Sequence, residues 1–298
     1  MAGIGKLVVI GVGLIGGSFA LALRRAGAAA NVVGVGRGRG NLDTARRLGL
    51  IDRALTLDEA WTAELADADL VFLATPVGAM PALLQTIAPH VGPHTVVTDA
   101  GSTKQDVIAA ARAGLGAAFP RFVPGHPIAG TEHSGAAAAF EALFRDRQVV
   151  LTPLPETDAG ACRTVADAWR RCGATVRVLD AARHDAILSA VSHLPHVIAF
   201  ALMAELGARP ESEQYLDLAG TGLRDLTRLA SSHAGMWRDV CLANRDALRS
   251  DIARYRAQLD HIDALLAERE GDALRALFAR ARAARNAWIE RSSGRDEA

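Results

Sequence analysis

The sequence predicts an α/β domain with a parallel, doubly wound sheet, followed by an all-helical domain. Up to about residue 180, short apolar segments of strand character alternate with helical patterns, as in parallel sheets with crossover helices. Beyond it, strand-like segments stop and apolar residues recur at helical spacing, as in Leu259, Ile262 and Leu266. We therefore expect domains at 1–180 and 181–298.

The expected elements follow from this alternation. Strand-like or extended segments lie at 6–10, 31–35, 69–74, 95–99, 121–126, 148–152 and 175–179. Helical patterns lie between them, at 14–26, 42–48, 78–88, 102–113 and 159–172. The second domain opens with a helix near 181–207 that is apolar nearly all round, which is typical of a buried helix. In so small a domain, this helix fits a dimer core as readily as a monomer core.

Composition excludes several classes of protein. The 298 residues include 33 basic and 33 acidic side chains, so bulk charge does not hold the chain to nucleic acid or to anionic membranes. The three cysteines lack the spacing of a zinc site and are an odd number, which favours a reducing cytoplasm and no metal centre. No signal-peptide pattern is visible at the start.

One apolar stretch, 187–206, has the length of a membrane span. It contains Ser189, Ser192, His193 and His196. Polar groups inside hydrocarbon are costly, so we expect a buried or interface helix and no membrane contact.

The first motif is glycine-rich and follows the first strand. Gly11 would make a tight turn, Gly13 would let the backbone approach a pyrophosphate, and Gly16 would let helix and strand pack closely. The following helix begins with Leu14 and Ile15, and the free N–H groups of its first turn would face the phosphates. This context predicts a Rossmann-type dinucleotide site; the alternative is a purely structural glycine turn.

The end of the second strand informs cofactor choice. NAD-binding domains of this type place a carboxylate there for the ribose hydroxyl, but this chain has Gly36, followed by Arg37 and Arg39. Guanidinium groups can pair with a 2′-phosphate, so we expect NADP as well as NAD to be accepted. The alternative is that both arginines are solvated loop charges. Thr75 and Pro76, which follow another strand, are expected to contact the cofactor too.

Ser102 and Lys104 follow the strand at 95–99. Ser102 and Gln105 have the spacing of a capping box, and this structural interpretation outweighs catalysis on spacing alone. The carboxyl end of such a strand also faces the ligand crevice, so Ser102 could lie near a cofactor. Lys104 is one of only two lysines, against 31 arginines, and its site could require an ammonium group.

His126 closes an extended segment and precedes Pro127, which keeps it out of the helical region. A single histidine is more often structural. Its place at a strand's carboxyl end in a nucleotide domain favours a general base.

Two further polar clusters lie in the helical part. His193 and His196, three residues apart, fit a substrate pocket better than a zinc site, since other ligands are not evident. Arg224 and Arg228, four apart after a glycine-broken turn, could bind a carboxylate. The alternative is ion pairing within the helix through Asp225.

Together these motifs resemble the prephenate and arogenate dehydrogenases of tyrosine biosynthesis. Six segments match in family order: 11–18, 99–104, 125–132, 192–196, 220–228 and 236–239. The resemblance implies oxidative decarboxylation of a cyclohexadienyl acid, which is either prephenate or arogenate, with hydride transfer to NAD or NADP. It also implies a homodimer formed through the helical domain.

The resemblance also assigns roles to residues. It makes His126 the catalytic histidine, with Ser102 hydrogen-bonding the same substrate hydroxyl. It implies that His196 and Arg228 bind the substrate carboxylates. The remaining substrate contacts that it implies are Trp237, Thr131 and Glu132, with Trp237 contributed by either subunit.

Two other functions fit parts of the pattern. The first is a hydroxyacid or imine reductase with a helical dimer domain, a class expected to use a lysine of that domain as acid or base. No lysine follows Lys104 in this chain, which argues against this class. A nicotinamide-binding redox sensor without turnover is the alternative from a different class, and it predicts that His126 is dispensable.

Overall fold

The structure, a computed structural model, describes residues 3–131 and 133–296. By internal contacts it consists of two compact units, Met1–Arg245 and Asp246–Ala298. The first unit extends well past residue 180 because helices beyond it contact the sheet domain. The expected boundary at 180 stays a prediction.

The first unit is built on a six-stranded parallel sheet of order β3-β2-β1-β4-β5-β6. Its strands are β1 (Ile4–Ile10), β2 (Ala29–Gly36), β3 (Arg53–Thr56), β4 (Leu70–Leu73), β5 (Val96–Asp99) and β6 (Phe122–Val123). The strand order reverses between β1 and β4, and ligands of open α/β sheets bind at the carboxyl ends beside such a reversal. The predicted fold class is confirmed. The short strand β3 was not among the strands expected from the sequence.

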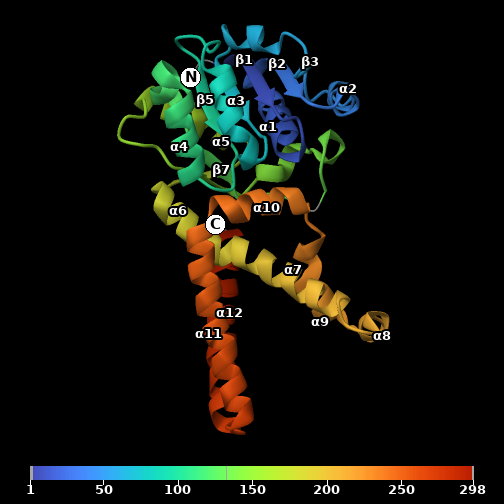
Figure 1. Ribbon diagram of the computed structural model, residues 1–298. Helices are drawn as coiled ribbons and strands as arrows, with labels where there is room; N and C mark the ends of the chain where they lie inside the picture. The colour runs from blue at the N-terminus through green and yellow to red at the C-terminus, as the bar shows by residue number, and fades with distance from the viewer. Residues whose placement is uncertain (1–2, 132, 297–298) are drawn as a thin grey trace. The chain divides into compact units, whose positions relative to one another are not determined.

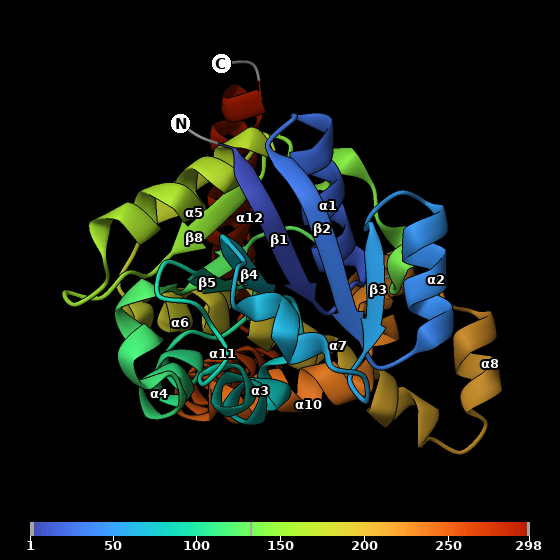
Figure 2. The same ribbon diagram turned by 90° about the horizontal axis from the view of Figure 1, so that it is seen from above.

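Helices cover both faces of this sheet (Figures 1 and 2). One face carries α1 (Leu14–Arg25), α2 (Arg39–Arg47) and α5 (Ala159–Arg171); the other carries α3 (Met80–Ile87) and α4 (Gln105–Gly114).

Side chains alternate along each strand, so Leu7 and Val9 of β1 enter the first core and Val8 and Ile10 the second. Burial on both faces explains why the strands are continuously apolar.

A second, three-stranded sheet contains β7 (Gly125–Pro127), β8 (Gln148–Leu151) and β9 (Thr175–Val178). β7 pairs with β8 antiparallel, and β8 pairs with β9 parallel. The extended segment expected at 121–126 is present, but it is divided between the two sheets: the chain leaves the main sheet after β6 and enters the second at β7. Pro124, between β6 and β7, has no N–H to donate to a ladder.

The helical run that follows is α6 (Ala181–Leu188), a π-turn (Ser189–His193) and α7 (Leu194–Gly207). The helix expected at 181–207 is present, with the π-turn just before Pro195, which lacks an N–H. This run is long and apolar enough to cross a membrane by length and composition alone, which is weak evidence for a span. Only 22% of its most apolar window is buried within one chain, so of the two alternatives expected, a buried helix or an interface helix, the first does not hold for a single chain and the second stays a prediction.

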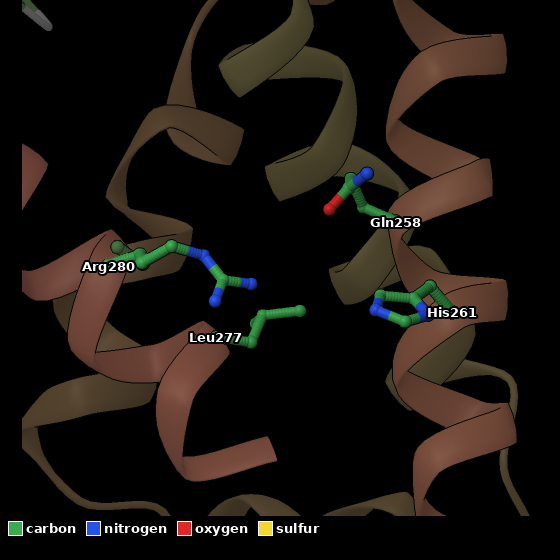
Figure 3. Close-up of a pocket in the computed structure, with 5 residues that line it drawn as sticks. Gln258, His261, Leu277 and Arg280 are labelled. Atoms are coloured by element: carbon green, nitrogen blue, oxygen red, sulfur yellow. The ribbon is translucent and has the colours of Figure 1, made fainter. Parts of the chain in front are cut away.

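The remaining helices of the first unit are short: α8 (Ser212–Asp217), α9 (Thr221–Thr227) and α10 (Ala234–Ala243). The second unit contains two long helices, α11 (Arg245–Ala267) and α12 (Gly271–Asp296). Between them is a pocket of about 510 Å³, lined by Gln258, His261, Leu277, Arg280 and Ala281 (Figure 3). None of the predicted site residues lines it.

Replacing Gly11 by Ala should destabilise the protein. Gly11 has φ +99°, and a Cβ there would lie 2.4 Å from the Ala74 carbonyl oxygen. We expect a loss of about 3 kcal/mol in the free energy of unfolding, measured by urea denaturation. Gly13→Ala is the control, because a Cβ at Gly13 meets no atom within 4 Å. Equal stability of the two variants would contradict the packing described.

Candidate active site

The turn between β1 and α1 is shaped to receive a dinucleotide. Gly11 takes a left-handed backbone conformation against Ala74, and a Cβ at Gly16 would lie 2.2 Å from the Gly11 carbonyl oxygen. Space is open at Gly13, the N-cap residue of α1, where no side chain caps the helix. Backbone N–H groups of the first turn, which includes Leu14 and Ile15, are thus available to an anion. These residues fit a bound pyrophosphate.

Two other expected cofactor contacts flank this turn. Thr75 follows β4, is half-buried, and would lie 3.2 Å from a Cβ at Gly11. Pro76 is exposed beside it. Both residues therefore border the glycine turn at the carboxyl ends of β1 and β4.

The two arginines after β2 differ in their surroundings. Arg37 is exposed, and no described residue pairs with its guanidinium group. Arg39 instead donates from Nη2 to Glu59 (2.6 Å) and from Nη1 to the Ala54 carbonyl (3.2 Å). Of the pair, only Arg37 is a free cation beside Gly36.

A buried chain of three side chains holds His126. Its Nδ1 lies 2.8 Å from Nε2 of His184, and Nδ1 of His184 lies 2.8 Å from Oδ1 of Asp185. An ionised Asp185 requires a proton on Nδ1 of His184, so Nε2 of His184 accepts a hydrogen bond from the Nδ1–H of His126. The unprotonated atom of His126 is then Nε2, the arrangement of an imidazole ready to act as a base.

Burial and hydrogen bonding determine the ionisation of His126 and Asp185. Burial, followed by the charges of His184, Lys104 and His193, lowers the pKa of His126 well below the usual 6.5. Burial raises the pKa of Asp185, but hydrogen bonds from His184, Gln105 and Lys104 outweigh it and leave this pKa below its usual value. At neutral pH, His126 is therefore neutral and Asp185 is a carboxylate.

The same carboxylate caps α4. Oδ1 of Asp185 accepts from the Lys104 N–H (2.8 Å) and Oδ2 from the Gln105 N–H (2.9 Å). No side chain of the preceding turn caps this helix, so the capping box predicted for Ser102 and Gln105 is wrong. A carboxylate 81 residues away occupies the position that Ser102 would have taken. Ser102 itself is half-buried in the turn before α4.

Lys104 is fully buried and joins two strands beside His126. Its ammonium group donates to Asp99 Oδ2 (2.5 Å) and to the Gly125 carbonyl (2.6 Å). Asp99 Oδ1 in turn accepts from the Gly125 N–H (3.0 Å). A compact ammonium fits between these oxygens, which agrees with the persistence of lysine in an arginine-rich chain. These contacts fix the strand that carries His126.

A second cluster surrounds Trp237 of α10. The ring of His196 stacks on Trp237 with centroids 3.5 Å apart, and His193 meets the indole at 6.0 Å. Asn244 connects this cluster to the first, donating to the Asp185 carbonyl (2.8 Å) and lying 3.2 Å from Nδ1 of His193. Burial lowers the pKa of His193 to about 4. The structure thus brings segment 192–196 and Trp237 together with the hydrogen-bonded side chains of His126, His184 and Asp185 within one unit.

His196 and Arg228 lie near one another. Burial lowers the pKa of His196, the hydrogen bond to the Ser192 carbonyl raises it, and the charge of Arg228 lowers it further. The Arg228 side chain is exposed, and no described residue pairs with its guanidinium group, so the alternative of pairing through Asp225 does not hold within the described chain.

The remaining expected contacts are less defined. Thr131 is exposed, and its hydroxyl accepts from the His133 N–H (3.2 Å). Glu132 lies outside the described residues. Among residues 3–131 and 133–296, no group of three His, Cys, Asp or Glu side chains could hold a metal ion.

His184, Asp185 and Asn244 were not predicted as site residues. The one available signal was an adjacent His-Asp pair at the start of an apolar helix, and nothing local links it to His126. Their contacts span 51 to 81 residues of chain, which spacing does not reveal.

Fold and site together define a dinucleotide-binding oxidoreductase. Profiles of the family described as "Prephenate dehydrogenase, nucleotide-binding domain" and "Prephenate dehydrogenase, dimerization domain" match residues 19–178 and 180–280. The chain belongs to the prephenate dehydrogenase family.

Several proteins are similar over nearly the whole chain. Cyclohexadienyl dehydrogenase of Zymomonas mobilis is 34% identical over 94% of each chain, and prephenate dehydrogenase of Bacillus subtilis is 32% identical over 97% of this chain and 77% of that one. The crystal structure of prephenate dehydrogenase from Aquifex aeolicus with hydroxyphenyl propionate and NAD+ is 31% identical, with a TM-score of 0.87 over 95% and 97% of the chains. Synechocystis arogenate dehydrogenase is 28% identical, with a TM-score of 0.78 over 95% and 99%.

Nitrogen-15 NMR should find His126 and His184 both protonated on Nδ1 and unprotonated on Nε2 at neutral pH. The two hydrogen bonds that end at Asp185 allow no other neutral arrangement. Asp185→Asn is the informative variant, since it removes the negative charge that determines which nitrogen of His184, and therefore of His126, carries the proton. A proton on Nε2 of His126 in the wild type would contradict this arrangement.

Proposed function

We propose that the protein catalyses oxidative decarboxylation of prephenate, with arogenate as a second possible substrate, and that His126 is its base. The observation that carries this is the neutral His126, whose Nδ1 is held by His184 and whose Nε2 is free. The known functions of the relatives support the reaction, and none of them supports a redox sensor without turnover.

His126 would remove the proton of the ring hydroxyl through Nε2. The positive charge formed on the imidazole would be stabilised through His184 by Asp185, which already carries a full negative charge. Ser102, in the turn before α4, would hydrogen-bond the same hydroxyl. The bound nucleotide supplies the hydride acceptor. Loss of carbon dioxide and aromatisation supply driving force, so orientation and proton removal are the main tasks of this site.

Arg228 and His196 would bind the substrate carboxylates. The chain has no net charge, so a dianion needs local cations, and Arg228 is an exposed guanidinium that no described residue neutralises. His196 is neutral in the free protein and would take up a proton with the carboxylate. The indole of Trp237 stacks on the ring of His196 and would hold that ring in place. Thr131 and Glu132 complete the proposed contacts.

The cofactor would be NADP or NAD. Gly11, Gly13 and Gly16 would receive the pyrophosphate, and Arg37 would pair with a 2′-phosphate beside Gly36. Thr75 and Pro76 would border the nicotinamide half.

The protein would work as a cytoplasmic homodimer. The second matching family domain is described as a dimerization domain, and α7 is apolar while only Ala199 of it is buried. A second copy of the chain is a better cover for this helix than lipid, because the π-turn before it buries Ser189 and His193.

The test is turnover. Purified protein is mixed with prephenate, or in a second series with arogenate, and with either NADP+ or NAD+, and absorbance of the reduced cofactor is followed. Turnover with both cofactors supports the proposal. Turnover only with arogenate would change the substrate, and no turnover with either acid would refute the enzyme assignment.

His126→Asn should lower kcat by about 10²-fold or more, because it removes the base. Its thermal unfolding and nucleotide binding should remain near those of the wild type. His90→Asn, which changes an exposed histidine, serves as the matched control and should keep full activity. Near-normal kcat in His126→Asn would refute the base assignment.

Arg37→Gln should weaken NADP+ binding about tenfold and leave NAD+ binding nearly unchanged, because only NADP+ carries the 2′-phosphate. Calorimetric titration measures both dissociation constants without turnover. Equal weakening for the two nucleotides would contradict a 2′-phosphate contact.

A further inference from the structure

A carboxylate from the turn that follows β3 lies beside the end of β2, where an acidic residue is lacking. In the sheet, Gly36 at the end of β2 is paired in register with Thr56 at the end of β3. Oε2 of Glu59 accepts from the Thr56 N–H (2.6 Å) and from the Thr56 hydroxyl (2.9 Å). The Glu59 carboxylate is therefore anchored at the edge where the ribose of a dinucleotide is expected.

This carboxylate also determines where Arg39 points. Arg39 is the first residue of α2, and its guanidinium reaches across to Glu59 (2.6 Å) and to the Ala54 carbonyl of β3 (3.2 Å). The hydrogen bonds from Thr56, followed by those from Arg39, lower the pKa of Glu59 to about 2, although the group is exposed. Glu59 is thus ionised at every working pH, and it neutralises one of the two arginines after β2.

The backbone at position 36 accepts a side chain. The atoms nearest to a Cβ at Gly36 belong to Leu42, the first at an ordinary 3.4 Å, and the φ of Gly36 is not in the left-handed region. The side chains around Gly36 that carry the charge at this edge are the free Arg37 and Arg39 bound to Glu59, with Asp43 and Asp58 also acting on Arg39 through their charges.

We propose that Glu59 is a specificity-determining residue that limits the preference for NADP over NAD by holding Arg39 against β3. With Glu59 in place, one cation faces the 2′-phosphate; without it, two would. The inference rests on the proposed use of Arg37 for that phosphate. It explains how a chain with two arginines after Gly36 can still accept NAD.

The test is Glu59→Gln, a change that keeps a hydrogen-bonding group and removes the charge. Dissociation constants for NADP+ and NAD+ are measured by calorimetry at low and high salt. We expect NADP+ to bind roughly tenfold more tightly and NAD+ to change less than about twofold, with the gain shrinking as salt screens the charge. An unchanged ratio of the two constants, or equal tightening of both, would overturn the proposal.

Two further variants separate the causes. Glu64→Gln is the matched control, because Glu64 also pairs with an arginine, Arg53, but lies with Lys6 toward the amino ends of the strands. It should leave the ratio unchanged. The double variant Glu59→Gln, Arg39→Gln should return the ratio to the wild-type value; a ratio that stays raised would show that Arg39 is not the group released.

The outcomes also separate this inference from the proposed function. If Arg37→Gln leaves NADP+ binding unchanged, the proposed role of Arg37 fails. If Arg37→Gln weakens NADP+ binding while Glu59→Gln has no effect, only the role of Glu59 fails.

Discussion

The carboxylate of Asp185 is the contact on which the rest of the site depends. It lies in α6, is 2% exposed, and accepts from His184, from the Lys104 and Gln105 N–H groups and from the Gln105 side chain. A buried charge is tolerated only when its oxygens are satisfied in this way. The first turn of α4, whose helix dipole favours an anion, supplies two of these donors. One side chain thus attaches the first helix after residue 180 to the nucleotide domain and orients the proposed base.

Glycine geometry and the buried ammonium complete the arrangement. The left-handed Gly11 lies close to Ala74, and of the three motif glycines Gly11, Gly13 and Gly16, Gly13 is the one with open space over it. Lys104 ties Asp99 at the end of β5 to Gly125 at the start of β7, and His126 follows directly. The expected phosphate site and the proposed base therefore both lie beside the carboxyl ends of the main sheet's strands: the glycine turn follows β1, and Lys104 holds the start of β7, which carries His126, against Asp99 of β5. The chain passes from the main sheet to the second sheet at Pro124, which has no N–H to extend the ladder of β5 and β6.

Local pattern predicted the order of strands and helices, because buried parallel strands are continuously apolar and amphipathic helices repeat every three to four residues. It also predicted the glycine turn and drew attention to Lys104. It failed where a distant group replaces a local one: the cap of α4 comes from Asp185, not from Ser102. The partners of His126 were missed for the same reason, since His184 is 58 residues away. The confinement of Arg39 by Glu59 likewise depends on the register of β2 and β3.

The pH dependence of kcat/KM for prephenate tests the central claim most directly, because kcat/KM reports the ionisation of the free enzyme. Burial holds the pKa of His126 below 6.5, and the base acts only when neutral. Activity should therefore not fall as the pH is lowered to 6.5, because proton uptake by His196 favours substrate binding in the same direction, and it should be lost only at lower pH. A midpoint at or above 6.5, or the same acid limb in His126→Asn, would contradict a base held neutral by its buried partners.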